Sequence, residues 1–335
     1  MNLPPAILIA LLPLSWLYGE VVRIRTALYA HGWLKQKRLS VPVISVGNLT
    51  VGGTGKTPMV LWLAERFLAE GKRVGILSRG YRGSNGTSDE IELLKSRLGA
   101  SVVFGVGPDR YVEGHRLESQ QRIDVFLLDD GFQHLQLARD VDILLMDASR
   151  DTGRDRLLPS GRLREPISAM ARADVLVFTR TEAQFGASSA IERLSEYPVF
   201  AARTRLVGYR LLGDDVKVLD AAEIGEGPFF AFCGLGNPQA FFRDLEAWGV
   251  PVCDRTVFAD HHRYMADDIR KLQQAAKDAA AKAFVTTEKD AQNLSGVRFE
   301  EYPVYVSVIE FEIASEEGFL AAIENKLRSH QGVAA

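Results

Sequence analysis

The sequence predicts an α/β protein built on a doubly wound, mostly parallel sheet. Short apolar segments rich in β-branched residues recur along the first half of the chain, as at 43–46, 73–77 and 123–128. They are nearly continuous rather than alternating, which is typical of parallel strands covered by helices on both faces. Segments with helical spacing of apolar residues, such as 58–70, separate these strands. This alternation favours parallel pairing through crossover helices.

The N-terminal segment, residues 3–18, is uncharged and strongly apolar. It is shorter than the ~20 residues that span a bilayer, and three prolines interrupt it. The basic residues follow the apolar run, whereas a signal peptide carries them before it. We therefore expect residues 1–38 to form a membrane-anchor helix and a basic juxtamembrane segment, either inserted in the bilayer or lying along it. The alternative is a core helix that caps the next domain.

A glycine-rich loop, Gly52-Gly53-Thr54-Gly55-Lys56-Thr57, separates the first strand from the helix that follows. Such a loop turns backbone N–H groups toward a nucleotide triphosphate at a helix N-terminus, while its lysine reaches the terminal phosphates and its hydroxyl coordinates magnesium. The strict pattern has glycine where this chain has Thr50. A plain flexible turn, however, has no need of Gly-Lys-Thr. The expected nucleotide contacts are Leu49, Thr50, Val51, Gly52, Gly53, Thr54, Gly55, Lys56 and Thr57, with Thr57 also a metal ligand.

Two adjacent carboxylates, Asp129 and Asp130, end the strand at 123–128. Phosphoryl transfer needs a carboxylate near the magnesium ion, usually at the end of a strand beside the loop strand. Adjacent carboxylates at a buried strand end repel each other unless a cation compensates them. We therefore expect both to lie near the metal. Asp147, at the end of the next apolar strand, is the competing candidate, or it caps a turn.

Further charged residues follow the strand at 73–77. Arg79 and Arg82 lie on a glycine-rich loop, where they can bind a phosphate or an anionic acceptor, although a solvated loop has the same composition. Asp89 and Glu90 come at an expected helix start. Either carboxylate can cap that helix, accept a proton or bind the metal.

A second strand, turn and helix pattern begins at residue 229, after a segment of weak periodicity. A chain of 335 residues has room for two cores. We therefore expect a phosphate-loop domain at 39–200, a β-rich linker at 201–227 and a smaller α/β domain at 228–335.

Two polar segments of this last domain are candidates for a site. His261 lies in the run Asp260-His261-His262, but a histidine in a polar loop is usually only solvated, and no further metal ligand has suitable spacing. The run Thr286-Thr287-Glu288-Lys289-Asp290 ends a later strand, where it can contact nucleotide.

The composition of the chain argues against nucleic acid as a partner. The formal net charge of −3 and pI of about 6.1 give no basic field of the kind that drives nucleic-acid binding. The two cysteines form no metal-ligand cluster and indicate no disulfide framework, which fits a reducing compartment. No obligate protein partner is indicated.

Several segments, in a fixed order over nearly the whole chain, carry a family resemblance. They are the N-terminal apolar segment, Ser45 to Pro58, Ser78 to Gly83, Asp89-Glu90, Asp129 to Gln133, Leu163 to Pro166, Asp260-His261 and Thr286 to Asp290. Together they resemble the tetraacyldisaccharide 4'-kinases, the lipid A 4'-kinase family. The family shares the departure at Thr50, so that residue does not weaken the loop assignment.

The resemblance implies an enzyme that transfers the γ-phosphate of ATP, with Mg²⁺, to the 4'-hydroxyl of a tetraacylated glucosamine disaccharide 1-phosphate. The product is lipid IVA, in lipid A biosynthesis. The implied location is the cytoplasmic face of the inner membrane of a Gram-negative bacterium.

The resemblance also implies roles on the nucleotide side. Lys56 and Thr57 hold phosphate and Mg²⁺, while Asp129 and Asp130 support the metal and the loop. Glu90 is a further metal contact.

On the acceptor side, the resemblance implies that Asp89 acts with His261 on the acceptor hydroxyl. Because these two residues fall in different expected domains, closure of the domains would bring them together. Arg79, Arg82 and Arg164 are candidate contacts to the phosphate that the acceptor carries.

Two rival interpretations stay open from the residues alone. One is a membrane-associated phosphate-loop NTPase that drives a protein partner and needs no lipid acceptor. The other is a noncatalytic membrane scaffold that binds nucleotide as a structural ligand. Such a scaffold has no need of Asp89, Asp129 and His261 together, so these residues favour an enzyme.

Overall fold

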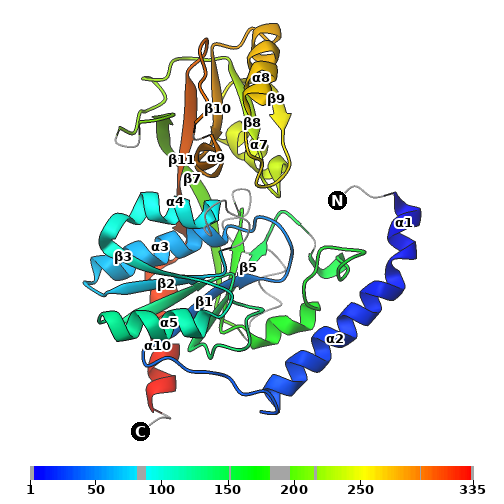
Figure 1. The fold of residues 1–335 in the computed structure, drawn as a ribbon, viewed down its shortest axis with the longest axis vertical. Helices are drawn as coiled ribbons and strands as arrows, with labels where there is room; N and C mark the ends of the chain where they lie inside the picture. Colours follow the sequence, from blue (N-terminus) through cyan, green and yellow to red (C-terminus); the bar gives the residue numbers. More distant parts are fainter. Residues whose placement is uncertain are drawn as a thin grey trace. The chain divides into compact units, whose positions relative to one another are not determined.

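Parallel strands build both compact units into which the chain divides (Figure 1). The computed structural model describes residues 4–80, 88–150, 152–181, 197–214, 217–294 and 296–332. Unit 1 comprises Met1–Arg82, Arg97–Arg203 and Glu312–Ala335, and unit 2 comprises Gly83–Ser96 and Thr204–Phe311. The units differ from the expected domains: the described part of Gly83–Ser96 belongs to unit 2, the C-terminal segment belongs to unit 1, and most of the expected linker at 201–227 belongs to unit 2.

The strands of unit 1 follow the order β3 (Val102–Val106), β2 (Val74–Ser78), β4 (Val125–Asp129), β1 (Val43–Asn48), β5 (Val141–Asp147) and β6 (Val175–Thr179), followed by β7 (Val199–Leu211), which continues into unit 2. The pairings between neighbours in this series are parallel. β1, β2, β4 and β6 are buried along their whole length, which is why their sequences are continuously apolar. The expected α/β fold with a mostly parallel sheet is confirmed.

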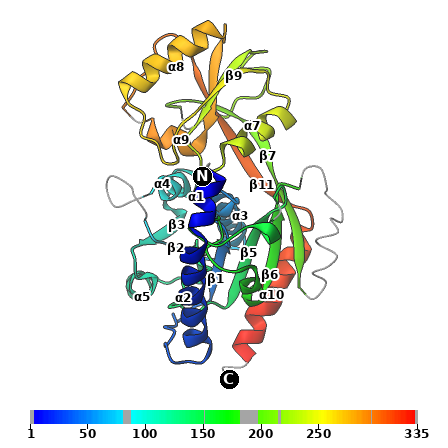
Figure 2. The ribbon, with the colours of Figure 1, turned by 90° about the vertical axis from the view of Figure 1, so that its right-hand side faces the viewer.

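Helices cover this sheet on both sides. α3 (Lys56–Ala69) and α5 (Arg110–Gln120) lie on opposite faces (Figure 1). Leu117 of α5 shares a core cluster with Leu77 and Phe126 of the strands. α10 (Glu316–Gly332) lies against unit 1 (Figure 2), where Phe319 meets Trp62 of α3 edge to face. Short 3-10 helices occur at Gly99–Ser101, Thr152–Arg154 and Ile167–Arg172.

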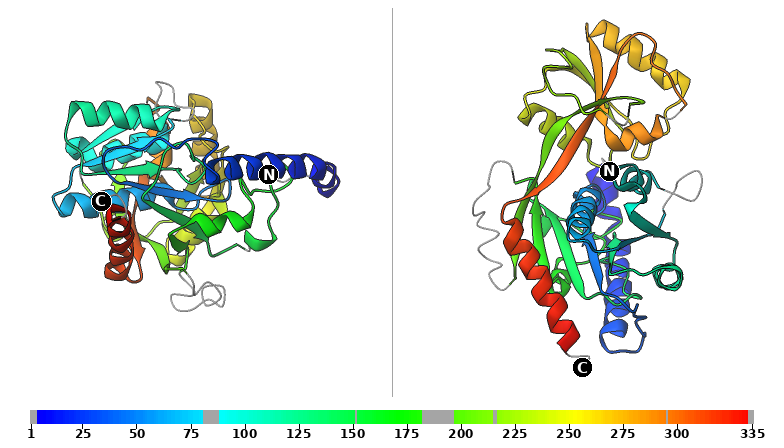
Figure 3. Two further views of the ribbon diagram at one scale, coloured as in Figure 1. Left: turned by 90° about the horizontal axis from the view of Figure 1, so that it is seen from below. Right: turned by 90° about the vertical axis from the view of Figure 1, so that its left-hand side faces the viewer.

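Two N-terminal helices, α1 (Pro5–Ala10) and α2 (Leu12–Ala30), belong to unit 1, and α2 reaches outward from its sheet (Figure 3). The hydroxyl of Ser15 donates to that of Ser160 at 2.7 Å, and the Tyr18 hydroxyl donates to the Arg164 carbonyl at 2.8 Å. None of the helices in the described part of the chain combines the length and the apolar character needed to span a bilayer.

Unit 2 contains a smaller parallel sheet, with strands in the order β11 (Val304–Ile313), β10 (Ala283–Thr287), β8 (Phe229–Cys233) and β9 (Val252–Val257). Its helices are α7 (Pro238–Ala247), α8 (Ala266–Asp278) and α9 (Glu288–Asn293), and α4 (Asp89–Leu98) begins in this unit. Phe232 and Phe284 pack edge to face in its core, with ring centroids 5.7 Å apart. The carboxyl ends of β9 and β10 lead into the segments that carry its polar cluster.

Candidate active site

The glycine loop of unit 1 joins the end of β1 to the first turn of α3. Gly52 (φ 108°) and Gly55 (φ 86°) adopt left-handed conformations that residues with a side chain rarely tolerate. Gly55 directly precedes Lys56, with which α3 begins. The loop therefore presents a helix N-terminus, with its partial positive charge, at the carboxyl end of a buried parallel strand. This arrangement binds phosphate.

A short antiparallel pairing fixes the segment that leads into the loop. Leu49 and Val51 bond to the backbone of residues 164 and 162 at 2.7 and 2.8 Å, and Thr50 forms a bridge with Leu163 between these bonds. A β-branched residue suits an extended bridge of this kind. The pairing explains why threonine stands where the general loop pattern has glycine.

Four polar side chains meet beneath the loop. The two terminal nitrogens of Arg164 each lie 2.8 Å from a carboxylate oxygen of Asp130, a bidentate pair, and Arg164 also donates to the Asn48 side chain. Lys56 Nζ lies 3.4 Å from Asn48 Oδ1 and 3.6 Å from Asp130 Oδ1. Partial burial raises the pKa of the Asp130 carboxyl, but Lys56 and Arg164 outweigh it and hold that pKa well below its usual range. Asp130 is therefore anionic.

The two candidate strand-end carboxylates differ in their surroundings. Asp129 is buried and ends β4, where it lies beside Val46 of the loop strand in the parallel register. Asp147 ends β5 and forms an ion pair with Arg180 at 2.9 Å. Arg180 in turn donates to the Gly53 carbonyl at 3.3 Å, so Asp147 supports the loop through an arginine. Asp129 as a metal ligand stays a prediction.

The structure places the three candidate arginines in different settings. Arg79 is exposed at the end of β2, and Arg82 lies outside the described residues. Arg164 pairs with Asp130, and its expected contact to the acceptor stays a prediction. Sequence reasoning missed Arg110, which is buried in the first turn of α5, and whose pKa is lowered by burial and by Arg79 and raised by Asp130 and Asp129. A buried arginine beside these carboxylates belongs to the charge balance of the site.

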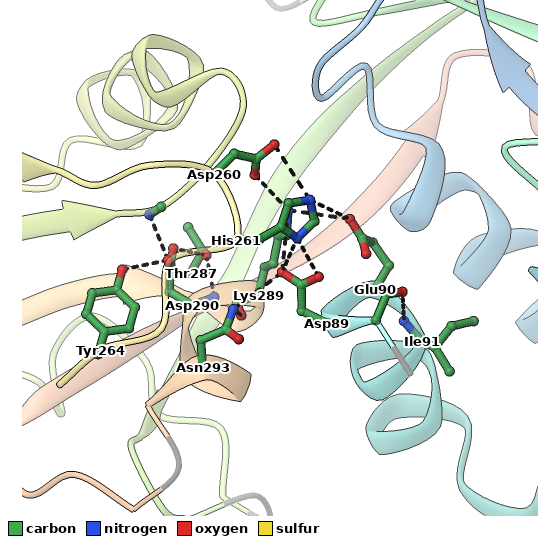
Figure 4. Close-up of polar contacts among 12 residues, drawn as sticks. Asp89, Glu90, Ile91, Asp260, His261, Tyr264, Thr287, Lys289, Asp290 and Asn293 are labelled. Carbon is green, nitrogen blue, oxygen red and sulfur yellow. Dashed lines mark hydrogen bonds and ion pairs between the residues drawn. The ribbon is translucent and has the colours of Figure 1, made fainter. Parts of the chain in front are cut away.

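A second polar cluster lies wholly in unit 2 (Figure 4). His261 Nδ1 lies 2.7 and 2.9 Å from the two carboxylate oxygens of Asp89, the first residue of α4. The Asp89 side chain is 6% exposed and that of His261 is 34% exposed. The expected partnership between these residues is therefore present as a contact, and both residues belong to unit 2.

Electrostatics couples these two side chains. Burial raises the pKa of Asp89. The hydrogen bond to His261 and the charge of Lys289 together outweigh burial and hold that pKa well below its usual range. The bond to Asp89 is the main cause that raises the pKa of His261, against a smaller opposing effect of burial. His261 also has a φ of 60°, which is uncommon for a residue with a side chain and typical of functional sites.

Glu90 belongs to this cluster and not to the loop cluster. Its Oε1 lies 3.8 Å from His261 Nε2 and 3.4 Å from Lys289 Nζ. Asp89, Glu90 and His261 could together hold a metal ion, because their ligand atoms lie within 4.8 Å of one another. Among the described histidines, cysteines, aspartates and glutamates, no other group of three or more does so. The ammonium of Lys289 already stands beside two of these three groups.

The chain is similar to known proteins over nearly its whole length. Residues 7–328 match the LpxK family, described as tetraacyldisaccharide-1-P 4'-kinase. The chain is 40% identical to a tetraacyldisaccharide 4'-kinase of Geobacter sulfurreducens over 331 residues, which cover 93% of this chain and 91% of that protein. A tetraacyldisaccharide 4'-kinase of Geobacter metallireducens is 39% identical, over 96% of this chain and 98% of that protein. A crystal structure of LpxK from Aquifex aeolicus in complex with ATP is similar, with a TM-score of 0.75, 33% identity and coverage of 96% of this chain and 99% of that one.

Proposed function

The chain belongs to the tetraacyldisaccharide-1-P 4'-kinase family, and from this premise we propose which of its residues carry out phosphoryl transfer. As a member of the family it is an ATP-dependent lipid A 4'-kinase, which phosphorylates the 4'-hydroxyl of tetraacyldisaccharide 1-phosphate in lipid A biosynthesis. The residue roles rest on one observation, which is that the candidate residues form two separate clusters. One is built around a phosphate loop, and the other around the contact between Asp89 and His261.

On the donor side, residues 49–57 bind the phosphates of ATP. The N-terminus of α3 and the ammonium of Lys56 supply the positive charge. Asp130 and Arg164 keep Lys56 in place through the contacts at 3.6 and 2.8 Å.

The donor set of this cluster fits Mg²⁺. The Thr57 hydroxyl and the carboxylates of Asp129 and Asp130 are hard oxygen ligands of the kind this ion prefers. Bound there, the ion would neutralise charge that develops on the phosphoryl oxygens. Glu90, in the other cluster, is a weaker candidate because Lys289 lies 3.4 Å from it.

On the acceptor side, the 4'-hydroxyl oxygen attacks the γ-phosphorus as the bond from that phosphorus to its bridging oxygen breaks and ADP leaves. The hydroxyl proton passes to the pair formed by Asp89 and His261. The pair suits this role because a buried carboxylate fixes the ring at Nδ1 and the more exposed imidazole faces solvent. Transfer requires that an acceptor bound at this pair reach the γ-phosphate bound at Lys56.

We also propose that α1 and α2 anchor the enzyme at the cytoplasmic face of the inner membrane. Small residues of α2 face unit 1: Ser15 bonds to Ser160, and Gly19 lies so close to Leu157 that a Cβ would be 2.7 Å from its side chain. The other faces carry exposed apolar side chains, which are Ile7, Ile9, Leu12, Leu14, Trp16, Leu17, Val21 and Ile24. An apolar surface on a helix that lies along the bilayer suits a lipid acceptor that stays in the membrane.

The deciding experiment measures transfer of labelled γ-phosphate from ATP with Mg²⁺ to tetraacyldisaccharide 1-phosphate in detergent micelles. We expect a labelled bis-phosphorylated lipid that disappears without acceptor and with Lys56→Ala. Release of inorganic phosphate alone, with or without lipid, would contradict the kinase assignment and support an NTPase that serves a protein partner.

A further inference from the structure

Two residues of α9, Lys289 and Asn293, contact the Asp89 carboxylate in addition to His261. Lys289 Nζ lies 3.5 Å from Asp89 Oδ2, and the side-chain amide of Asn293 donates to the same oxygen at 3.3 Å (Figure 4). Positions 289 and 293 are one helical turn apart and therefore share a face of α9. The sequence run that contains Lys289 thus contacts the Asp89 and His261 cluster, although the expectation was a contact to nucleotide.

Lys289 is the cation on which three carboxylates converge. Its Nζ lies 3.0 Å from Asp260, 3.4 Å from Glu90 and 3.5 Å from Asp89, and its side chain is 18% exposed. Three carboxylates this close together repel one another unless a positive charge compensates them. A largely buried ammonium supplies that charge from the protein itself, and it holds the three groups in one arrangement.

The helix that carries these residues is itself tightly fixed. Asp290 is buried, and one of its carboxylate oxygens accepts hydrogen bonds from the Gly234 backbone and the Tyr264 hydroxyl, both at 2.7 Å. Its other oxygen accepts from Thr287 at 2.6 Å. Tyr264 lies three residues beyond His261, so α9 fixes the loop that carries the histidine as well as the carboxylate that the histidine contacts.

We propose that Lys289 and Asn293 are positioning residues for phosphoryl transfer, which hold the Asp89 carboxylate in the orientation that His261 requires. The proposal rests on the proposed role of Asp89 and His261. Without the two contacts from α9, rotation about the side chain of Asp89 would separate its oxygens from His261 Nδ1, and repulsion from Glu90 and Asp260 would favour that rotation.

The first test compares turnover in Lys289→Met, Lys289→Arg and Asn293→Ala with that of the wild type. We expect kcat to fall about 10- to 100-fold in Lys289→Met and about 3- to 10-fold in Asn293→Ala, with the KM for ATP within about 2-fold. Lys289→Arg should recover part of the loss, because it restores the charge. Lys271→Met is the matched control, since Lys271 pairs with Asp267 on exposed α8 and should leave turnover unchanged.

The second test asks whether Lys289 acts through Asp89. In an Asp89→Asn background, adding Lys289→Met should lower the residual kcat by less than about 2-fold, because the positioned group is already lost. Equal losses in both backgrounds, or a loss confined to the KM for ATP, would overturn the proposal. Thermal unfolding checks that each variant is folded; if Lys289→Met is not, Asn293→Ala and Lys289→Arg carry the same test.

These variants distinguish a failure of the proposed function from a failure of the positioning role. Full turnover in Asp89→Asn and His261→Ala would contradict the proposed function itself. Loss of turnover in those two variants, with unchanged turnover in Lys289→Met and Asn293→Ala, would contradict only the positioning role.

Discussion

At the scale of single residues, the charge balance around Asp130 decides how the phosphate loop is held. This residue has a φ of 51°, which is uncommon for a residue with a side chain, and it forms a bidentate pair with Arg164. Strained backbone of this kind persists only where the surroundings fix it. The planar guanidinium that binds both carboxylate oxygens is what fixes it here.

A conservative change at Arg164 should therefore be costly. Lysine keeps the charge but cannot bind both oxygens of Asp130 or reach Asn48 at the same time. We expect Arg164→Lys to lower kcat about 10-fold or more and to lower the free energy of unfolding by about 1–3 kcal/mol. Steady-state kinetics and denaturant unfolding would check both. Arg122→Lys, at an exposed position, is the control, and equal behaviour of the two variants would contradict the assignment.

His134 makes stability depend on pH. Burial, together with Arg110 and Arg139, lowers the pKa of His134 from 6.5 to about 4. The unfolded chain takes up this proton below pH 6.5, whereas the folded chain resists it down to about pH 4, so stability is full above pH 6.5 and falls as the pH drops through this window. Because His134 is only partly buried, solvent screening reduces the loss of unfolding free energy to about 1–2 kcal/mol. Denaturant unfolding from pH 7 to 4 should show that the free energy of unfolding depends less on pH in His134→Gln than in the wild type. Parallel curves for the two proteins would contradict this role of His134.

At the scale of secondary-structure elements, the composition of α2 differs between its inner and outer faces. Its small and polar residues contact unit 1 through Ser15, Gly19 and Tyr18. Its large apolar residues stay exposed, with Trp16 at 66% and Leu17 at 55%. A helix that is apolar on its outer face, yet fixed to a folded unit on its inner face, is suited to lie on a membrane surface.

The exposed face of α2 gives a direct prediction. Trp16→Glu with Leu17→Glu should lower partition onto anionic phospholipid vesicles about 10-fold or more, while turnover with substrate in detergent micelles stays within about 3-fold. Deletion of residues 1–18 should also lower partition onto these vesicles. Cosedimentation with vesicles measures the partition, and an unchanged partition in both variants would refute the anchor.

At the scale of the whole molecule, the two clusters belong to different compact units, so binding of ATP and activation of the acceptor should separate in mutants. Lys56 and the loop lie in unit 1, whereas Asp89 and His261 lie in unit 2. We expect Asp89→Asn to lower kcat about 100-fold or more and to leave the affinity for ATP within about 2-fold. Titration calorimetry with a nonhydrolysable ATP analogue, beside turnover measurements, would show this.

The companion variant is Lys56→Ala, which should lose both turnover and affinity because we propose that its ammonium binds the phosphates of ATP. If Asp89→Asn instead lost affinity for ATP while its turnover at saturation was kept, Asp89 would belong to the metal shell of the nucleotide.

The sequence by itself determined the parallel α/β fold, the phosphate loop and the carboxylates that end β4. These features depend on local periodicity or on contiguous motifs, which leave a signal in the order of residues. The resemblance to a family added the partnership of Asp89 with His261, which residue types alone did not indicate.

Only the tertiary structure decided which distant side chains meet. Asp89 and His261 are 172 residues apart in the chain, and Asp89 and Asn293 are 204 apart. Contacts of this kind follow from how strands and helices pack and have no fixed spacing, so only the fold shows that Lys289 and Arg164 each lie beside a carboxylate.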